Sequence, residues 1–220
     1  MTVKGIVFSA LFAALMVVLG YFQITLPFTP VPIILGNLAV MLAGAMLGPW
    51  YGFFSVALVV VLSILGLPLI QGHGGLGLLL GASGGFVWGW PFCALLTGWA
   101  VGRVKGHGLL SWLGIFVSIE VFGSLFNYVP AIPQLMAVAH LSFAKAMVEG
   151  FYPFLLGDAL KALVASLVVW PVRRVFPPAR LTGHHTTPVV PLDVRGEYGA
   201  FDKFVFCRLH LLHPLRKWTF

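Results

Sequence analysis

The chain has 220 residues, of which 60% are hydrophobic and only 9% are charged. A soluble domain carries about 25% charged residues, so most of this protein's surface is not built to face water. The formal net charge is +7, but the basic residues flank apolar segments instead of forming one face, which argues against nucleic-acid binding. The composition predicts an integral, multi-pass membrane protein in contact with lipid.

Six apolar segments are separated by proline, glycine or basic links. A helix needs about 20 apolar residues to cross a bilayer, and six such spans fit the chain. In chain order, the predicted spans cover residues 5–26, 33–47, 50–70, 84–101, 109–128 and 151–172. We therefore expect an all-α integral membrane protein with six transmembrane helices in a domain over residues 1–180, followed by a poorly ordered polar tail over residues 181–220.

The basic residues predict the orientation of the spans. With six spans, both ends share one side with the second-to-third and fourth-to-fifth links. That side carries six basic residues: Lys4, Arg103, Lys105, Arg173, Arg174 and Arg180. Of the basic residues before the tail, only Lys145 falls on the other side. Because cytoplasmic loops are enriched in lysine and arginine, we expect both termini, and the tail, in the cytoplasm.

This orientation places three irregular segments on the outer side: PFTPVP, QGHGGLG and the stretch after Tyr128. Irregular backbone near a membrane is tolerated only where protein buries it or where it lines a wet cavity. We therefore expect a site that opens to the outside.

Few ionisable residues lie within the predicted spans. An intramembrane charge costs several kcal/mol, so Asp158 and Lys161 are candidates for function. Their spacing of three places both on one helix face, about 5–6 Å apart. They can neutralise each other as an ion pair, or they can offer an acceptor and a cation to a solute that carries N–H groups and an anionic end; we favour the solute. Glu120 is isolated, and a hydrogen bond to a neighbouring helix accounts for it equally well.

Small and aromatic residues suggest further roles. Ala10 and Ala14 form a small-residue stripe that can pack inside the protein or receive a partner's helix. Phe86 is one of several aromatic residues around the fourth span that could stack on a flat ligand ring. The sequence GASGG resembles the Gly-x-Ser-Gly motif of rhomboid proteases, with Ser83 as nucleophile, but no histidine lies within another span to serve as its base.

Several segments together resemble the BioY family, the biotin-specific substrate-binding (S) components of energy-coupling factor transporters. The resemblance covers residues 5–176 through SALFAALM, PFTPVPI, LAVMLAGAMLGP, GLPLIQGHGGLGLLLGASGGF and GFYPFLLGDALKALVA. It implies a six-helix protein of a bacterial or archaeal plasma membrane that captures biotin from outside and is not an enzyme. Release then depends on a transmembrane coupling protein and a pair of cytosolic ATPases.

The resemblance also implies roles for particular residues, with no metal or cofactor. The Gly-Asp-x-x-Lys motif of the sixth span implies that Gly157, Asp158 and Lys161 contact the ligand, with Asp158 accepting from a ureido N–H. Ala10 and Ala14 are the implied docking surface for the coupling protein. The further residues expected at the ligand are Asn37, Gly74, Gly75, Gly84, Gly85 and Phe86. Another vitamin-like solute, or a membrane scaffold without a ligand, stays open as an alternative.

Overall fold

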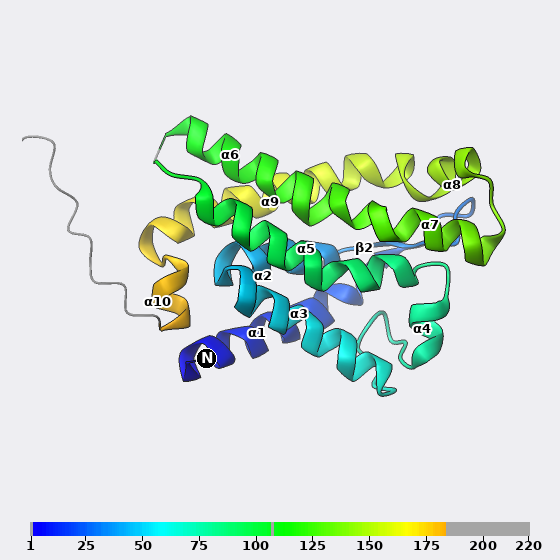
Figure 1. Cartoon of the computed structure of the whole chain (residues 1–220), viewed down its shortest axis with the longest axis horizontal. Helices are drawn as coiled ribbons and strands as arrows, with labels where there is room; N and C mark the ends of the chain where they lie inside the picture. The colour runs from blue at the N-terminus through cyan, green and yellow to red at the C-terminus, as the bar shows by residue number, and fades with distance from the viewer. Residues whose placement is uncertain (1, 107, 184–220) are drawn as a thin grey trace, which may run out of the picture. The chain divides into compact units, whose positions relative to one another are not determined.

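The computed structural model describes residues 2–106 and 108–183, which form a bundle of helices (Figure 1). Its helices are α1 (Val3–Gly20), α2 (Gly36–Leu47), α3 (Pro49–Ile64), α4 (Leu76–Leu80), α5 (Gly84–Arg103), α6 (Leu109–Ile119), α7 (Tyr128–Ala139), α8 (Phe143–Gly150), α9 (Tyr152–Val175) and α10 (Pro178–Thr182). Two short antiparallel strands, β1 (Gln23–Ile24) and β2 (Ile33–Ile34), form a hairpin between α1 and α2.

Among the described residues, three helical segments are long and apolar enough to cross a membrane: Val3–Gly20, Leu109–Ala139 and Tyr152–Val175. The second of these is continuous because a π-helical turn, η1 (Glu120–Ser124), and a 3-10 turn, η2 (Leu125–Asn127), join α6 to α7. The helices α2 and α3 are apolar but shorter. Many large apolar side chains lie exposed on the outside of the bundle, as expected for a surface that meets lipid rather than water.

The short helix α2 lies at the centre of the bundle, with ten of its 12 residues buried. Small residues let its neighbours approach closely. A Cβ at Gly44 would lie 2.3 Å from the carbonyl oxygen of Ala94 on α5, and one at Gly98 would lie 2.5 Å from the carbonyl carbon of Gly48. Both distances are impossible for a larger side chain, so these glycines fix the contact of α5 with α2 and with the start of α3.

The helix ends differ from the predicted spans at several points. Instead of continuing to residue 26, α1 ends at Gly20, because the apolar residues that follow enter the hairpin; Leu35 N donates to Phe22 O at 3.0 Å. For the same reason α2 begins at Gly36 and not at residue 33. The helix α3 stops at Ile64 and does not continue to residue 70. Gly66, two residues after its end, takes a φ of +102°, which a helix cannot contain.

The remaining predicted spans agree better with the helices. The fourth span corresponds to α5 and the sixth to α9, each within three residues at either end. The fifth predicted span corresponds to the longer helix Leu109–Ala139, which continues beyond residue 128 because η1 and η2 preserve its helical hydrogen bonding. In the region predicted as a tail, Thr182 still belongs to α10 and is buried, whereas residues 184–220 lie outside the described part of the chain.

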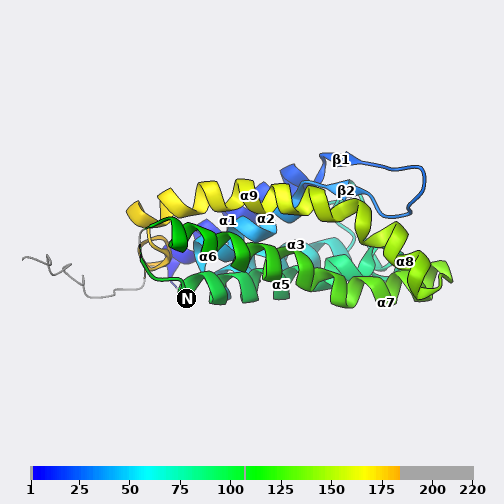
Figure 2. The same ribbon diagram turned by 90° about the horizontal axis from the view of Figure 1, so that it is seen from above.

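The hairpin, α4 and α8 lie at one end of the bundle, as Figures 1 and 2 show. The first residues of α1, the link from α5 to α6, and α10 lie at the opposite end. The hairpin, the loop before α4 and the segment around α8 therefore lie at the same end of the bundle, which we call its mouth.

Candidate functional site

Asp158 and Lys161 lie one turn apart on α9 and face the interior of the bundle. Lys161 Nζ lies 2.9 Å from Asp158 Oδ1, and the two residues are only 9% and 6% exposed. Their predicted proximity is thus present in the structure. A buried ion pair of this kind rarely repays the cost of its desolvation, so stability alone is a poor reason for its presence.

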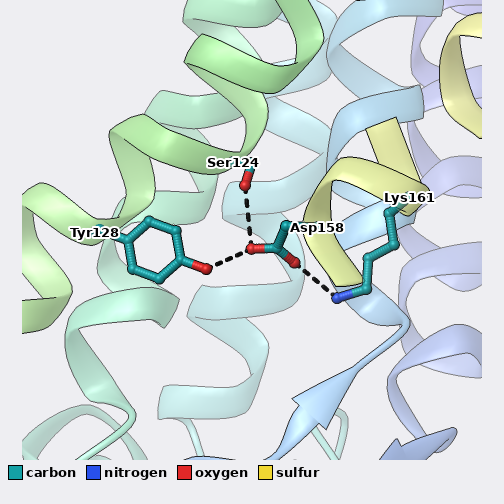
Figure 3. A network of polar contacts seen from close by, with 4 residues as sticks. All are labelled: Ser124, Tyr128, Asp158 and Lys161. Carbon is teal, nitrogen blue, oxygen red and sulfur yellow. Dashed lines mark hydrogen bonds and ion pairs between the residues drawn. The ribbon is translucent and has the colours of Figure 1, made fainter. Parts of the chain in front are cut away.

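Two hydroxyl groups from the long helix Leu109–Ala139 complete the surroundings of Asp158. Ser124 Oγ donates to Asp158 Oδ2 at 3.1 Å, and Tyr128 Oη donates to the same oxygen at 2.6 Å (Figure 3). The carboxylate is therefore held by one cation and two hydroxyls. This arrangement fixes its orientation and offsets part of the cost of burying its charge.

The irregular backbone of η1 and η2 explains how these hydroxyls reach Asp158. In η1 the hydrogen bonds widen to the i→i+5 pattern, and Leu125 N donates to Glu120 O. A π turn changes the phase of the side chains that follow it, and such turns occur frequently at functional sites. Here Ser124 ends the π turn and Tyr128 begins α7, so both approach the same carboxylate oxygen.

The pair keeps capacity to bind a further group. Asp158 Oδ1 accepts one hydrogen bond among the described residues, from Lys161. A carboxylate oxygen can accept two, and an ammonium group can donate three. A ligand that presents an N–H donor next to an acceptor oxygen could therefore engage both side chains without breaking the ion pair.

These side chains line a cavity with about 510 Å³ of empty space, a volume that includes space open to solvent. Phe86, Trp90 and Phe154 supply aromatic surface, and Val31 and Gln71 come from the segments at the mouth of the bundle. The cavity thus combines a polar end with apolar and aromatic walls, as expected for a site that binds a small amphipathic solute.

The structure brings four of the predicted ligand residues together at this cavity: Asn37, Phe86, Asp158 and Lys161. The predicted glycines are not among the residues that line it. A Cβ at Gly84 would meet Leu79 O at 2.0 Å, and one at Gly85 would meet Ala131 Cα at 2.6 Å, so both allow close backbone packing.

The other three predicted glycines are likewise not among the residues that line the cavity. Gly74 packs against the backbone of Leu67, Gly75 takes a φ of +89° before α4, and Gly157 meets no atom within 4 Å of a built Cβ. Ligand contact by these glycines stays a prediction.

Sequence reasoning missed three polar residues of the site: Ser124, Tyr128 and Asn127. With its amide nitrogen turned toward Phe86 O, Asn127 donates at 3.0 Å and accepts from Trp90 Nε1 at 3.3 Å. A polar residue in an apolar span was the available signal for Ser124 and Asn127. Ser124 reaches Asp158, and Asn127 reaches the cavity, through the irregular turns η1 and η2, which hydropathy does not reveal.

Two other predicted features can be placed. Ala10 and Ala14 are exposed on α1, as a docking surface requires. Ser83, the nucleophile of the protease alternative, lines the cavity, but no histidine among the described residues lines it. A serine without a nearby base is not activated for acyl transfer.

Comparison with known proteins agrees with this geometry. The sequence model of the BioY family matches residues 1–178. A relative from Rhizobium etli, named biotin transporter BioY, is 39% identical over 173 residues, which are 76% of this chain and 92% of the relative. A protein of the same name from Lactococcus lactis subsp. cremoris is 34% identical over 78% of this chain and 92% of its own length.

A solved structure is also similar to this chain. It is described as the S-component for biotin from an ECF-type ABC transporter, and it aligns with a TM-score of 0.74 at 32% identity. The alignment covers 79% of this chain and 95% of the solved one. With the family match and the identities above, these findings show that the chain belongs to the BioY family.

Proposed function

We propose that this protein captures biotin at the outer face of a bacterial or archaeal plasma membrane, as the S component of an energy-coupling factor transporter. It works as a membrane-embedded binding protein and not as an enzyme. The observation that carries the proposal is the buried Asp158–Lys161 pair at a small-molecule cavity, in a chain whose relatives are named biotin transporters.

The chemistry of biotin suits this cavity. Its ureido ring has two N–H donors and one carbonyl, and its thioether ring is apolar. Asp158 Oδ1 accepts from one ureido N–H, and Lys161 Nζ donates to an acceptor oxygen of the ligand. Phe86 and Trp90 then cover the apolar rings, because burying aromatic surface against other apolar groups is favourable in free energy.

For the topology, we propose six spans with both termini in the cytoplasm. The spans would be α1, α2, α3, α5, the helix Leu109–Ala139, and α9. The positive-inside rule supports this orientation, because the end with the start of α1 and the end of α9 carries Lys4, Arg173 and Arg174. The cavity then opens outward, beneath the hairpin and the loop that contains Gln71.

The partners in this proposal are a transmembrane coupling protein and a pair of cytosolic ATPases. The exposed stripe of Ala10 and Ala14 supports docking of the coupling protein on α1, since small residues let two helices approach closely in lipid. The ligand and the partners occupy separate parts of the molecule, as a capture-and-release cycle requires.

Uptake of labelled biotin tests the function. The protein is expressed in bacteria that lack their own biotin transporter, with and without the coupling protein and ATPases. We expect accumulation of biotin that unlabelled biotin blocks and that pantothenate or niacin does not. Blockage by pantothenate or niacin would instead favour the alternative of another vitamin-like solute, and no accumulation with the complete module would contradict the proposal.

A further inference from the structure

Two arginines at the end of the bundle opposite the mouth lie over tryptophan rings of their own helices. Arg103 Cζ lies 3.4 Å from the centre of the Trp99 ring on α5, and Arg174 Cζ lies 3.7 Å from that of Trp170 on α9. In both pairs the arginine follows the tryptophan by four residues, which places the two side chains on one face of the helix, a turn apart. The same pair thus occurs at the same end of two different helices.

The direction of these side chains is unusual for arginines at the end of a membrane helix. Such arginines normally extend their charged group away from the apolar region and into water. In the orientation proposed above, Arg103 and Arg174 instead fold back over a ring one helical turn nearer to the membrane interior, about 5–6 Å along the helix axis. The cation–π contact offsets part of the cost. A guanidinium at this depth meets the headgroup region of the bilayer.

This end of the bundle has a one-sided charge. The acidic residues of the described part of the chain are Glu120, Glu149 and Asp158. Glu120 lies in η1, in the middle of its long helix, Glu149 belongs to α8 at the mouth, and Asp158 lies at the cavity. The start of α1, the ends of α5 and α9, the link after α5, and α10 carry only basic residues: Lys4, Arg103, Lys105, Arg173, Arg174 and Arg180.

The Arg103–Trp99 pair is accessible from outside the bundle. Arg103 is exposed, Trp99 is 48% exposed, and Phe122 packs edge-on against the indole with the ring centres 6.3 Å apart. The Arg103 guanidinium makes no hydrogen bond or ion pair with another described residue, whereas Arg180 Nη1 donates to Val175 O at 3.3 Å. The five N–H donors of Arg103 can therefore serve an acceptor from outside the protein.

We propose that Arg103, positioned by Trp99, binds the phosphate of an anionic phospholipid in the cytoplasmic leaflet, and that Arg174 over Trp170 forms a second site of this kind. A guanidinium donates two parallel hydrogen bonds to one phosphate, and stacking on a ring leaves its N–H edge directed outward. The surrounding positive charge favours an anionic lipid over a zwitterionic one. Orientation in the membrane would need only positive charge, which lysine supplies equally well. The stacked pair requires arginine.

Titration followed by native mass spectrometry tests the proposal, because it resolves each lipid bound to the detergent-purified protein. Phosphatidylglycerol is compared with phosphatidylethanolamine of the same acyl chains. We expect the wild type to bind phosphatidylglycerol more tightly, and Arg103→Gln to raise its Kd about tenfold, as for lost hydrogen bonds to a charged group. Arg103→Lys keeps the charge but not the planar group and should also weaken binding. The matched control Arg180→Gln removes an unstacked arginine at the same end and should leave Kd nearly unchanged.

Because Arg103 is exposed and far from the cavity, all these variants should bind biotin with wild-type Kd. Glycerol 3-phosphate at the same concentration should not displace the lipid; displacement would assign the site to a soluble phosphate and contradict the proposal. Equal Kd values for the two lipids on the wild type, or for phosphatidylglycerol on Arg103→Gln and Arg180→Gln, would overturn it, as would wild-type Kd in Arg103→Lys. If lipid binding shows no preference but Arg103→Gln fails to assemble with the coupling protein, this surface serves that protein and the proposal is wrong.

Discussion

Two regions of the bundle are built on opposite principles. Where α2, α3 and α5 meet, glycines remove side chains so that the backbones of neighbouring helices touch. At the cavity, by contrast, the protein buries an ion pair, two hydroxyls and an amide, and it interrupts a long helix to do so. The first region is what a membrane bundle needs to be stable. The second costs stability, and such residues in a membrane usually serve function.

The largest effect is expected from Asp158→Ala. The substitution leaves Lys161 buried without its partner, and breaking a buried pair in this way costs about 3–5 kcal/mol. We expect lower thermal stability in detergent and loss of measurable biotin binding by calorimetry. The double variant Asp158→Leu/Lys161→Met is the control, because it removes both charges. It should recover the thermal stability without the binding, and recovery of both would mean that the pair does not serve the ligand.

Gly98→Val tests the close packing of α5 against α2 and α3 instead. Its side chain would collide with the backbone at Gly48, so we expect a loss of about 3 kcal/mol in the free energy of unfolding, the upper range for overpacking. Gly102→Val, one turn further along α5, is the matched control because nothing lies within 4 Å of its Cβ. Unfolding experiments should separate the two variants, while the folded fraction of each binds biotin with nearly wild-type Kd. Equal stability of the two variants would show that the close contact at Gly98 does not matter.

Tyr128→Phe is a smaller change at the cavity than the loss of Asp158. It removes the shortest hydrogen bond to Asp158 and keeps the ring, so we expect biotin binding to weaken by about 1.5 kcal/mol, as for one hydrogen bond to a charged group. The variant should fold normally, because the ring still packs edge-on against Phe86 and Phe151. Calorimetry with an unchanged Kd would remove Tyr128 from the group that orients the carboxylate.

Ser124→Ala should have the smallest effect, about 1 kcal/mol in biotin binding, because Tyr128 still donates to the same oxygen. Ser118→Ala is the matched control on the same helix: its hydroxyl donates to Gly114 O within the helix and does not reach the cavity. Equal Kd values for the two variants would show that Ser124 does not act through Asp158.

The helices and the ion pair could be predicted from the sequence. Hydropathy located the helices well, because an apolar segment between glycine, proline or basic residues has few other structures available in a membrane. The spacing of Asp158 and Lys161 revealed the ion pair, because one helical turn brings such residues together whatever surrounds them.

Other features depended on tertiary contacts and could not be read in this way. The hairpin β1–β2 was hidden inside apolar segments, since its residues are as hydrophobic as the helices around them. Ser124 and Tyr128 meet at Asp158 only because the π turn alters the helical phase, and no hydropathy pattern predicts such a turn. The close backbone contact of Gly84 with α4 and of Gly85 with α7 is likewise a tertiary feature, and ligand contact by these glycines stays a prediction.

Titration of biotin into the purified wild-type protein and into Asp158→Asn tests the central claim most directly. Asparagine keeps the shape of the side chain but removes the charge that fixes Lys161 and one of the acceptor oxygens. The account predicts tight binding by the wild type and a loss of about 1–3 kcal/mol in the variant, which is about 5- to 150-fold in Kd. Equal Kd values for the two proteins would contradict it, because the buried pair would then have no part in holding the ligand.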